Sequence, residues 1–234
     1  MLHNILIEKI LFVDVETVST AASYDELSQR MQSLWQKKHK NIARDEELSF
    51  SESYENNAGI YAEFGRIVCI SCGFIHEGVL RIKSFYSHDE RELLEGFRAL
   101  LQANLNLQML CGHNIKEFDV PYVCRRMLVN GVKLPYILDI AGKKPWEVNF
   151  IDTMQLWKFG DYKSYTSLDL LAALFDIPTP KDDIDGSMVG KVFWEENDLE
   201  RIANYCQKDV VTVVRLFQKY RNEKMLAEEQ IVFV

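Results

Sequence analysis

The sequence predicts an α/β protein in which a mixed β-sheet is flanked by helices, with a helical insertion after the first strand. Two observations support this class. Short apolar runs rich in Val, Ile and Phe alternate with longer segments whose apolar residues have helical spacing. The 234 residues also contain no internal repeat and no Pro- or Gly-rich linker. We therefore expect a single domain over residues 1–234, with the insertion at about residues 19–60.

Composition excludes several classes of protein. A hydrophobic content of 47% and an aromatic content of 12% exclude a chain that is disordered throughout. The most apolar stretch, residues 67–75, is far shorter than the roughly 20 residues of a membrane-spanning helix. The five cysteines lie in apolar segments and the start of the chain lacks signal-peptide features, so we expect reduced thiols, a cytoplasmic location and no membrane association. The net charge of −8 argues against a broad basic face for duplex nucleic acid, but allows a small acidic metal site.

The first part of the chain predicts three strands and one helix. In order, these are a strand at 10–17, a helix at 24–38, a polar connection at 41–59 and strands at 66–75 and 79–86. The connection is acidic and is expected to be the least ordered part of the chain. Glu77-Gly78 lies between the last two strands, which predicts a hairpin.

The second part predicts mainly helices. Ser87 and Glu90 have the spacing of a capping box and indicate where a helix begins. The elements that follow are a strand at 107–111, a helix with Pro121 near its start and Asn130-Gly131 at its end, a last strand at 149–152, and helices at 166–175, 187–195 and 199–220.

Asp14 and Glu16 are the first candidate functional residues. Side chains two apart on a strand project from the same face, so these carboxylates point together while Val13 and Val15 point the other way. Two adjacent carboxylates repel each other unless a cation lies between them or one is protonated. A solvated strand face is the alternative. The strand is otherwise apolar, where unpaired charge is costly, and this favours a metal site.

Three further candidates follow later in the chain. Asp119 comes close to the start of a helix, where a cap or a first-turn acid is the ordinary role. Tyr205 and Asp209 lie one turn apart on the final helix, at the border of its buried stripe. Taken singly, each of these positions has an ordinary structural explanation.

Taken in order, the candidates resemble the motifs of a known superfamily. The three motifs are Asp14-x-Glu16, Asn114-x4-Asp119 with Phe118 before the Asp, and Tyr205-x3-Asp209. They resemble those of the DEDD 3′–5′ exonucleases, which have a ribonuclease H-like fold, and the tyrosine resembles the DEDDy branch. The DEDDh branch has a histidine where this chain has Asn204.

Further segments narrow the resemblance. Residues 61–71 and 181–187 look like parts of the predicted exonuclease family related to the proofreading domains of family B DNA polymerases, although Ala62 stands where Pro is expected. Residues 150–157 look like the strand-to-helix segment D-T-x-x-L of these enzymes. The resemblance extends from about residue 11 to residue 217.

The resemblance implies a role for each matching residue. Asp14, Glu16, Asp119 and Asp209 would hold two divalent cations, Mg²⁺ or Mn²⁺, which suit carboxylate oxygens. Tyr205 would orient the attacking water, since a phenol with a pKa near 10 is a poor general base. Asn114 and Phe118 would contact the substrate.

The implied activity is 3′–5′ exonucleolytic hydrolysis of single-stranded DNA to nucleoside 5′-monophosphates. An exoribonuclease and a non-catalytic module that binds 3′ ends are the alternatives. The expected partners are a single-stranded 3′ end and proteins of replication or DNA repair.

Other side chains are candidates for contact with the strand. The aromatic ones are Phe118, Tyr122 and Trp157, and the basic ones are Lys143, Lys144, Lys158, Lys163 and Lys181. For the aromatic residues core packing is the more ordinary role, and for the lysines a solvated surface. The insertion is either a lid or strand guide over the site, or a peripheral helix with a loose acidic loop.

Overall fold

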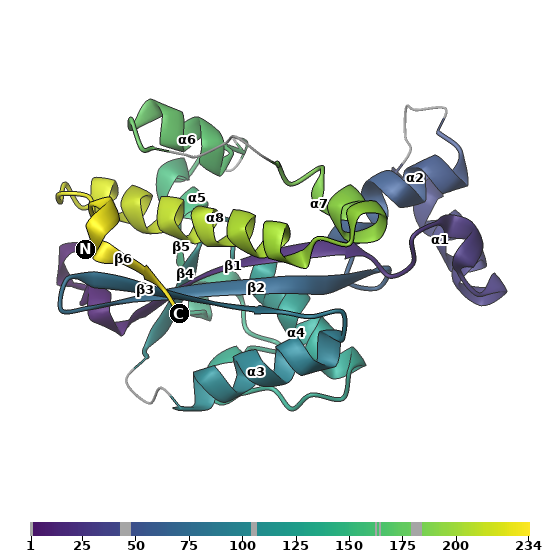
Figure 1. The fold of residues 1–234 in the computed structure, drawn as a ribbon, viewed down its shortest axis with the longest axis horizontal. Helices are drawn as coiled ribbons and strands as arrows, with labels where there is room; N and C mark the ends of the chain where they lie inside the picture. The colour runs from purple at the N-terminus through teal and green to yellow at the C-terminus, as the bar shows by residue number, and fades with distance from the viewer. Residues whose placement is uncertain (1, 43–47, 104–106, 162, 164, 179–183) are drawn as a thin grey trace.

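A mixed sheet forms the centre of the protein (Figure 1). The computed structural model describes residues 2–42, 48–103, 107–161, 163, 165–178 and 184–234. Within them the sheet has six strands in the order β5-β4-β1-β2-β3-β6. The strands are β1 (Ile10–Ser19), β2 (Gly65–His76), β3 (Val79–Tyr86), β4 (Met109–Gly112), β5 (Ile151–Asp152) and β6 (Ile231–Phe233).

The pairing places β1 in the interior of the sheet. It pairs antiparallel with β2 and parallel with β4, and β2 and β3 form the predicted hairpin. The expectation that residues 149–152 form the last strand is wrong, because β6 pairs parallel with β3 near the end of the chain. A run as short as Ile-Val-Phe has no readable periodicity, so only its pairing with β3 identifies it as a strand.

Helices cover both faces of the sheet (Figure 1). α8 lies along one face with α5, α6 and α7 on the same side, and α3 and α4 cover the other. The helices are α1 (Gln29–Ile42), α2 (Phe50–Asn57), α3 (Glu90–Ala103), α4 (Asp119–Val129), α5 (Thr153–Lys158), α6 (Leu168–Leu174), α7 (Val189–Lys191) and α8 (Leu199–Tyr220). A π-helical turn, Val192–Glu196, follows α7. None of the described helices is both long and apolar enough to cross a membrane.

Alternate side chains of β1 point to opposite faces of the sheet, as the sequence predicts. Ile10 and Phe12 pack with Val213 and other residues of α8, while Val13 and Val15 pack into the core under α3 and α4. Asp14 and Glu16 therefore face α8. All five cysteines lie within the described residues and are free thiols, as expected.

The insertion differs from its prediction. The helix expected at 24–38 begins at Gln29. The described part of the acidic connection is ordered as α2, whose first turn has a complete capping box formed by Ser49 and Glu52. Residues 43–47 lie outside the described residues. The expectation of a loose loop fails because Tyr54 and Trp35 are fully buried in a small aromatic core of the insertion itself.

The start of α3 is right, but its predicted cap is wrong. Asp89, rather than Ser87, accepts from the backbone N–H groups of Arg91 and Glu92. Glu90 is buried instead and accepts from the Arg126 guanidinium at 2.6 and 2.8 Å. Because Glu90 also accepts from the backbone of Ile67, it joins α3 and α4 to β2.

Removing the cation of this buried pair is expected to be costly. Arg126→Met leaves the Glu90 carboxylate buried without its partner, which should lower the free energy of unfolding by about 3–5 kcal/mol. Arg98→Met is the matched control, because Arg98 pairs with Glu95 at a partly exposed position and should cost less than about 1 kcal/mol. Urea unfolding measures both values, and equal costs would show that the buried pair has no special role.

Candidate functional site

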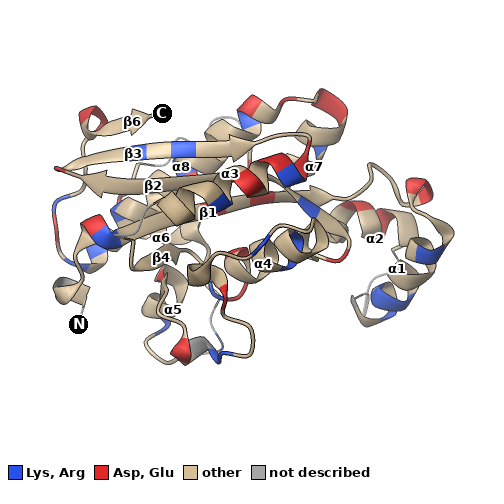
Figure 2. Cartoon of the chain, turned by 90° about the horizontal axis from the view of Figure 1, so that it is seen from below, with Lys and Arg blue, Asp and Glu red and all other residues tan. Residues whose placement is uncertain are grey.

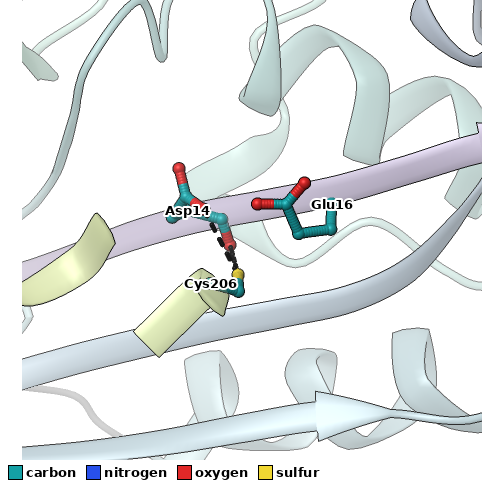
Figure 3. A group of neighbouring side chains, drawn as sticks. All are labelled: Asp14, Glu16 and Cys206. Atoms are coloured by element: carbon teal, nitrogen blue, oxygen red, sulfur yellow. Dashed lines mark hydrogen bonds between the residues drawn. The ribbon is translucent and has the colours of Figure 1, made fainter. Parts of the chain in front are cut away.

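Two carboxylates on β1 form the centre of the site. Asp14 is half-buried and Glu16 is 9% exposed, and both project from the same side of the strand (Figure 3). The pairing with β2 is irregular beside Glu16, because Glu16 pairs with Cys69 but Thr17 pairs with Ile67. Bulges of this kind re-aim side chains, and they are frequent next to active sites.

Cys206 of α8 lies directly against Asp14 (Figure 3). Its thiol is within hydrogen-bonding distance of the backbone oxygen and of Oδ2 of Asp14, at 3.4 and 3.3 Å. The ligand atoms of Asp14, Glu16 and Cys206 all lie within 4.8 Å of one another. Burial raises the pKa of Cys206 well above its usual range, so the protonated thiol acts here as a hydrogen-bond donor that orients Asp14.

Asp119 brings a third carboxylate to β1 from the start of α4. β4 pairs with β1 only as far as Phe12, and beyond that point Asp119 accepts a hydrogen bond from the backbone N–H of Val15, between Asp14 and Glu16. The side chain is almost fully buried. Burial raises its pKa to about 7, and the charge of Asp152 adds to the effect.

Tyr205 and Asp209 complete the group from α8. Both are half-buried, as their place at the border of the buried stripe predicts. Tyr205 donates a hydrogen bond to Asp209. Burial raises the pKa of Tyr205, and the negative charges of Asp209 and Glu16 raise it further. The phenol is therefore neutral at physiological pH and serves as a hydrogen-bond donor rather than as a base.

The carboxylates repel one another. Burial raises the pKa of Asp14 well above its usual range, and the charges of Asp209 and Asp119 raise it further. Burial also raises the pKa of Glu16, with Asp14 and Asp209 adding to the effect. Among the described residues, no lysine or arginine is a main influence on either pKa. Carboxylate oxygens gathered in this way fit divalent cations such as Mg²⁺ or Mn²⁺.

Asp152 holds the loop that leads to Asp119. Its carboxylate accepts from the backbone N–H groups of Asn114 and Lys116 at 3.1 and 3.2 Å, and it also caps α5. At Gly112, at the start of the loop, a Cβ would lie 2.8 Å from the Val13 oxygen, so no larger residue fits there. The sequence marked Asp152 only as part of a strand-to-helix segment, and its connection to the loop is visible only in the structure.

Asn114 stands at the turn of this loop. Its backbone is left-handed, with φ of 65°, and among the described residues its buried Oδ1 has no hydrogen-bond partner. An unpartnered amide oxygen of this kind is consistent with the expected contact to substrate. The neighbouring His113 has a structural role, because Nε2 donates to the Thr166 carbonyl at 2.9 Å and Nδ1 lies 3.0 Å from the Thr153 hydroxyl.

A cleft with a volume of about 760 Å³ opens beside Glu16 and is lined by Phe118. Of the other aromatic candidates, Tyr122 is buried in the core and Trp157 packs against Phe175 and Tyr220. Lys181 lies outside the described residues. The other four candidate lysines do not line the cleft, whereas Lys191 and Trp194, which sequence reasoning missed, do. Both belong to a short helical segment with no distinctive motif.

Comparisons with known proteins identify the family. Residues 60–231 match the family described as "Predicted 3'-5' exonuclease related to the exonuclease domain of PolB". The chain is 25% identical over 175 residues to "DNA polymerase 120R" of Invertebrate iridescent virus 3, an alignment covering 61% of this chain and 15% of that protein. β1 and most of the insertion precede the family match.

A solved structure shares the fold. The family B DNA polymerase of the hyperthermophilic archaeon Pyrobaculum calidifontis superposes with a TM-score of 0.55 and 13% identity, over 90% of this chain and 24% of the polymerase. The mixed sheet flanked by helices is therefore ribonuclease H-like, as predicted. The chain spans less than a quarter of the length of either polymerase.

Replacing Asp14 by Asn is expected to stabilise the metal-free protein at pH 8. Folding holds the carboxylates together, so their raised pKa values mean that the metal-free fold loses stability as the pH rises from about 4 through the pKa of Asp119, about 7. Each pKa unit corresponds to about 1.4 kcal/mol. We expect Asp14→Asn to raise the free energy of unfolding in EDTA by about 1 kcal/mol or more.

Urea unfolding at a series of pH values measures this gain, which should grow with pH. Asp139→Asn, at an exposed position, should give no gain. A variant that is less stable than the parent at pH 8 would show that burial and repulsion of the carboxylates do not dominate the stability of the site.

Proposed function

Because the chain belongs to the family of predicted 3′–5′ exonucleases related to the exonuclease domain of PolB, we propose that it removes nucleotides from the 3′ end of single-stranded DNA. The observation that supports this most directly is the convergence of carboxylates from β1, α4 and α8. Each step below belongs to the proposal.

Asp14, Glu16, Asp119 and Asp209 hold two divalent cations, Mg²⁺ or Mn²⁺. The donor set fits this assignment, because its negative charges lie close together and are partly buried. When bound, such a pair activates water and stabilises the negative charge that develops on the leaving oxygen. Cys206 keeps the Asp14 carboxylate oriented, and the Val15 N–H does the same for Asp119.

Hydrolysis cleaves the last phosphodiester bond of the strand. The water oxygen forms a bond to phosphorus, the bond to the O3′ of the preceding nucleotide breaks, and that oxygen takes up a proton. A nucleoside 5′-monophosphate leaves and a shorter strand with a 3′-hydroxyl remains. Tyr205 orients the water, since its neutral hydroxyl lies against Asp209. Phe118 and Asn114 contact the nucleotide from the loop that leads to Asp119.

Two alternatives give distinct results in the same experiments. An exoribonuclease would use the same site on RNA, since aromatic stacking accepts every base. A module that only binds 3′ ends would not need a tyrosine hydrogen-bonded to the last carboxylate. Proteins of replication or DNA repair are the proposed partners, because the chain matches parts of DNA polymerases.

The activity itself is tested with 5′-labelled single-stranded DNA and RNA of the same sequence in Mg²⁺ or Mn²⁺. We expect a ladder that shortens from the 3′ end of the DNA. Asp14→Asn should reduce the rate by about a hundredfold or more, the range for loss of one charge-stabilising group, with Asp139→Asn as control. Faster shortening of RNA would favour the exoribonuclease. Substrates that stay intact although metal and oligonucleotide bind would favour the end-binding module.

The role of Tyr205 is tested by Tyr205→Phe. Loss of the hydroxyl should lower kcat by about a hundredfold and leave the affinity for Mn²⁺ unchanged, as measured by calorimetry. Tyr136→Phe is the matched control, because Tyr136 is 97% exposed. An unchanged kcat would disprove the water-orienting role, and a large loss of Mn²⁺ affinity would show that the tyrosine acts through the metal ligands.

A further inference from the structure

The insertion between β1 and β2 forms one side of the cleft beside Glu16. From the insertion, the lining residues are Ala22, the α2 residues Glu55 and Asn56, and Gly59 and Ile60 of the turn after α2. Other lining residues come from the segment around α7, chiefly Gly186, Lys191 and Trp194. The insertion therefore lies at the site rather than at the periphery.

The insertion is held in a fixed position. A Cβ at Gly65 would lie within 3 Å of the backbone oxygens of Gly59 and Val18, so the chain passes against β1 too closely for any larger residue. Tyr122 donates to the Gly59 oxygen at 2.8 Å, and the Ala21 N–H donates to the Tyr54 hydroxyl at 3.1 Å. Close backbone packing and buried hydrogen bonds describe a wall and not a lid.

The wall presents an apolar surface to the cleft. Ile60 is 54% exposed although it lines a cleft next to charged residues. Phe118 lies next to the wall. Its ring centroid is 5.4 Å from that of Tyr122, and the Tyr122 hydroxyl donates a hydrogen bond to the Gly59 oxygen. Exposed apolar side chains in such a place suit the face of a nucleic-acid base.

Charge favours a base rather than a phosphate beside the wall. The helix α2 is acidic, whereas α1 is basic (Figure 2), and Glu55 of α2 joins Glu16 in the lining. The cation in the described lining, Lys191, comes from α7 and not from the insertion. Around it the cleft is open, since a Cβ at Gly190 would meet no atom within 4 Å. A phosphate is therefore favoured on the Lys191 side and a base on the Ile60 side.

We propose that the insertion is a fixed wall of the subsite for the last nucleotide and that Ile60 packs against the terminal base of an unpaired strand end. This inference rests on the proposed function. The family match begins at residue 60, so it includes Ile60 and leaves out the residues of the wall that precede it. A base that is paired to a second strand cannot present its face to Ile60 in this way, so the wall would favour unpaired ends.

The inference is tested by binding alone, in an Asp14→Asn background without hydrolysis. The probe is 5′-fluorescein-labelled octathymidylate, and fluorescence anisotropy gives its Kd. Ile60→Ser should weaken binding about fivefold or more, because it removes an apolar contact with the base. Ile60→Leu should restore it. Leu128→Ser, which changes an exposed leucine of α4 away from the cleft, should have less than a twofold effect.

A second probe identifies which nucleotide Ile60 contacts. The same oligonucleotide with an abasic residue at its 3′ end should bind the Asp14→Asn protein as weakly as the normal probe binds the Ile60→Ser variant. The Ile60→Ser variant should bind the abasic probe no more weakly than it binds the normal probe, because the substitution and the missing base remove the same contact. A blunt duplex should bind at least tenfold more weakly than the single strand.

The inference is overturned if Ile60→Ser binds as tightly as the Leu128→Ser control while its melting temperature is unchanged. It is also overturned if the losses of binding free energy caused by Ile60→Ser and by the abasic residue are additive. The same holds if the duplex binds as tightly as the single strand. These outcomes do not depend on catalysis. If the protein hydrolyses neither DNA nor RNA but the binding measurements give the expected results, the exonuclease proposal is wrong and the proposal about the wall stands.

Discussion

Repulsion between carboxylates inside the fold is the constraint on which the rest of the structure depends. β1 is an interior strand, and such strands are usually apolar on both faces when helices cover both sides. Here Asp14 and Glu16 occupy one face of β1, the face that packs against α8. Asp119 and Asp209 bring further negative charge to the same place. Carboxylates gathered in this way destabilise the fold in the absence of a cation. Functional sites are often destabilising in this sense, and the surrounding structure compensates for the cost.

The scaffold around β1 resists that repulsion by fixing backbone as well as side chains. Asp119 is tied to the Val15 N–H and Asp14 to the Cys206 thiol. Asp152 holds the loop before α4 through two backbone N–H groups. The buried pair of Glu90 and Arg126 fixes α4 against α3 and β2. The carboxylates are therefore held in place before any ligand arrives, which lowers the cost of binding.

The insertion forms a wall beside the carboxylate site. Its aromatic core, with Trp35 and Tyr54 buried, lets a segment with many acidic residues pack as a rigid unit against the end of β1. The wall that results borders the cleft beside Glu16 without contributing a carboxylate from the motifs. Chemistry and selection of the strand end would then reside in separate parts of the chain, one on the sheet and one on the insertion.

The sequence by itself determined the features that depend on local periodicity. The alternation of β1, the hairpin at Glu77-Gly78 and the whole of α8 follow from patterns of two and 3.6 residues. The sequence motifs also predicted the family, which the match over residues 60–231 confirms. Only the tertiary structure decided the features that depend on contacts between residues distant in sequence. Glu90 has the spacing of a capping residue but forms a buried ion pair with Arg126. The described part of the acidic connection forms the helix α2. The bond from Cys206 to Asp14, the approach of Asp119 to Val15 and the place of Ile60 belong to the same group. These contacts join residues that no local pattern relates, so the packing of the sheet and helices determines them.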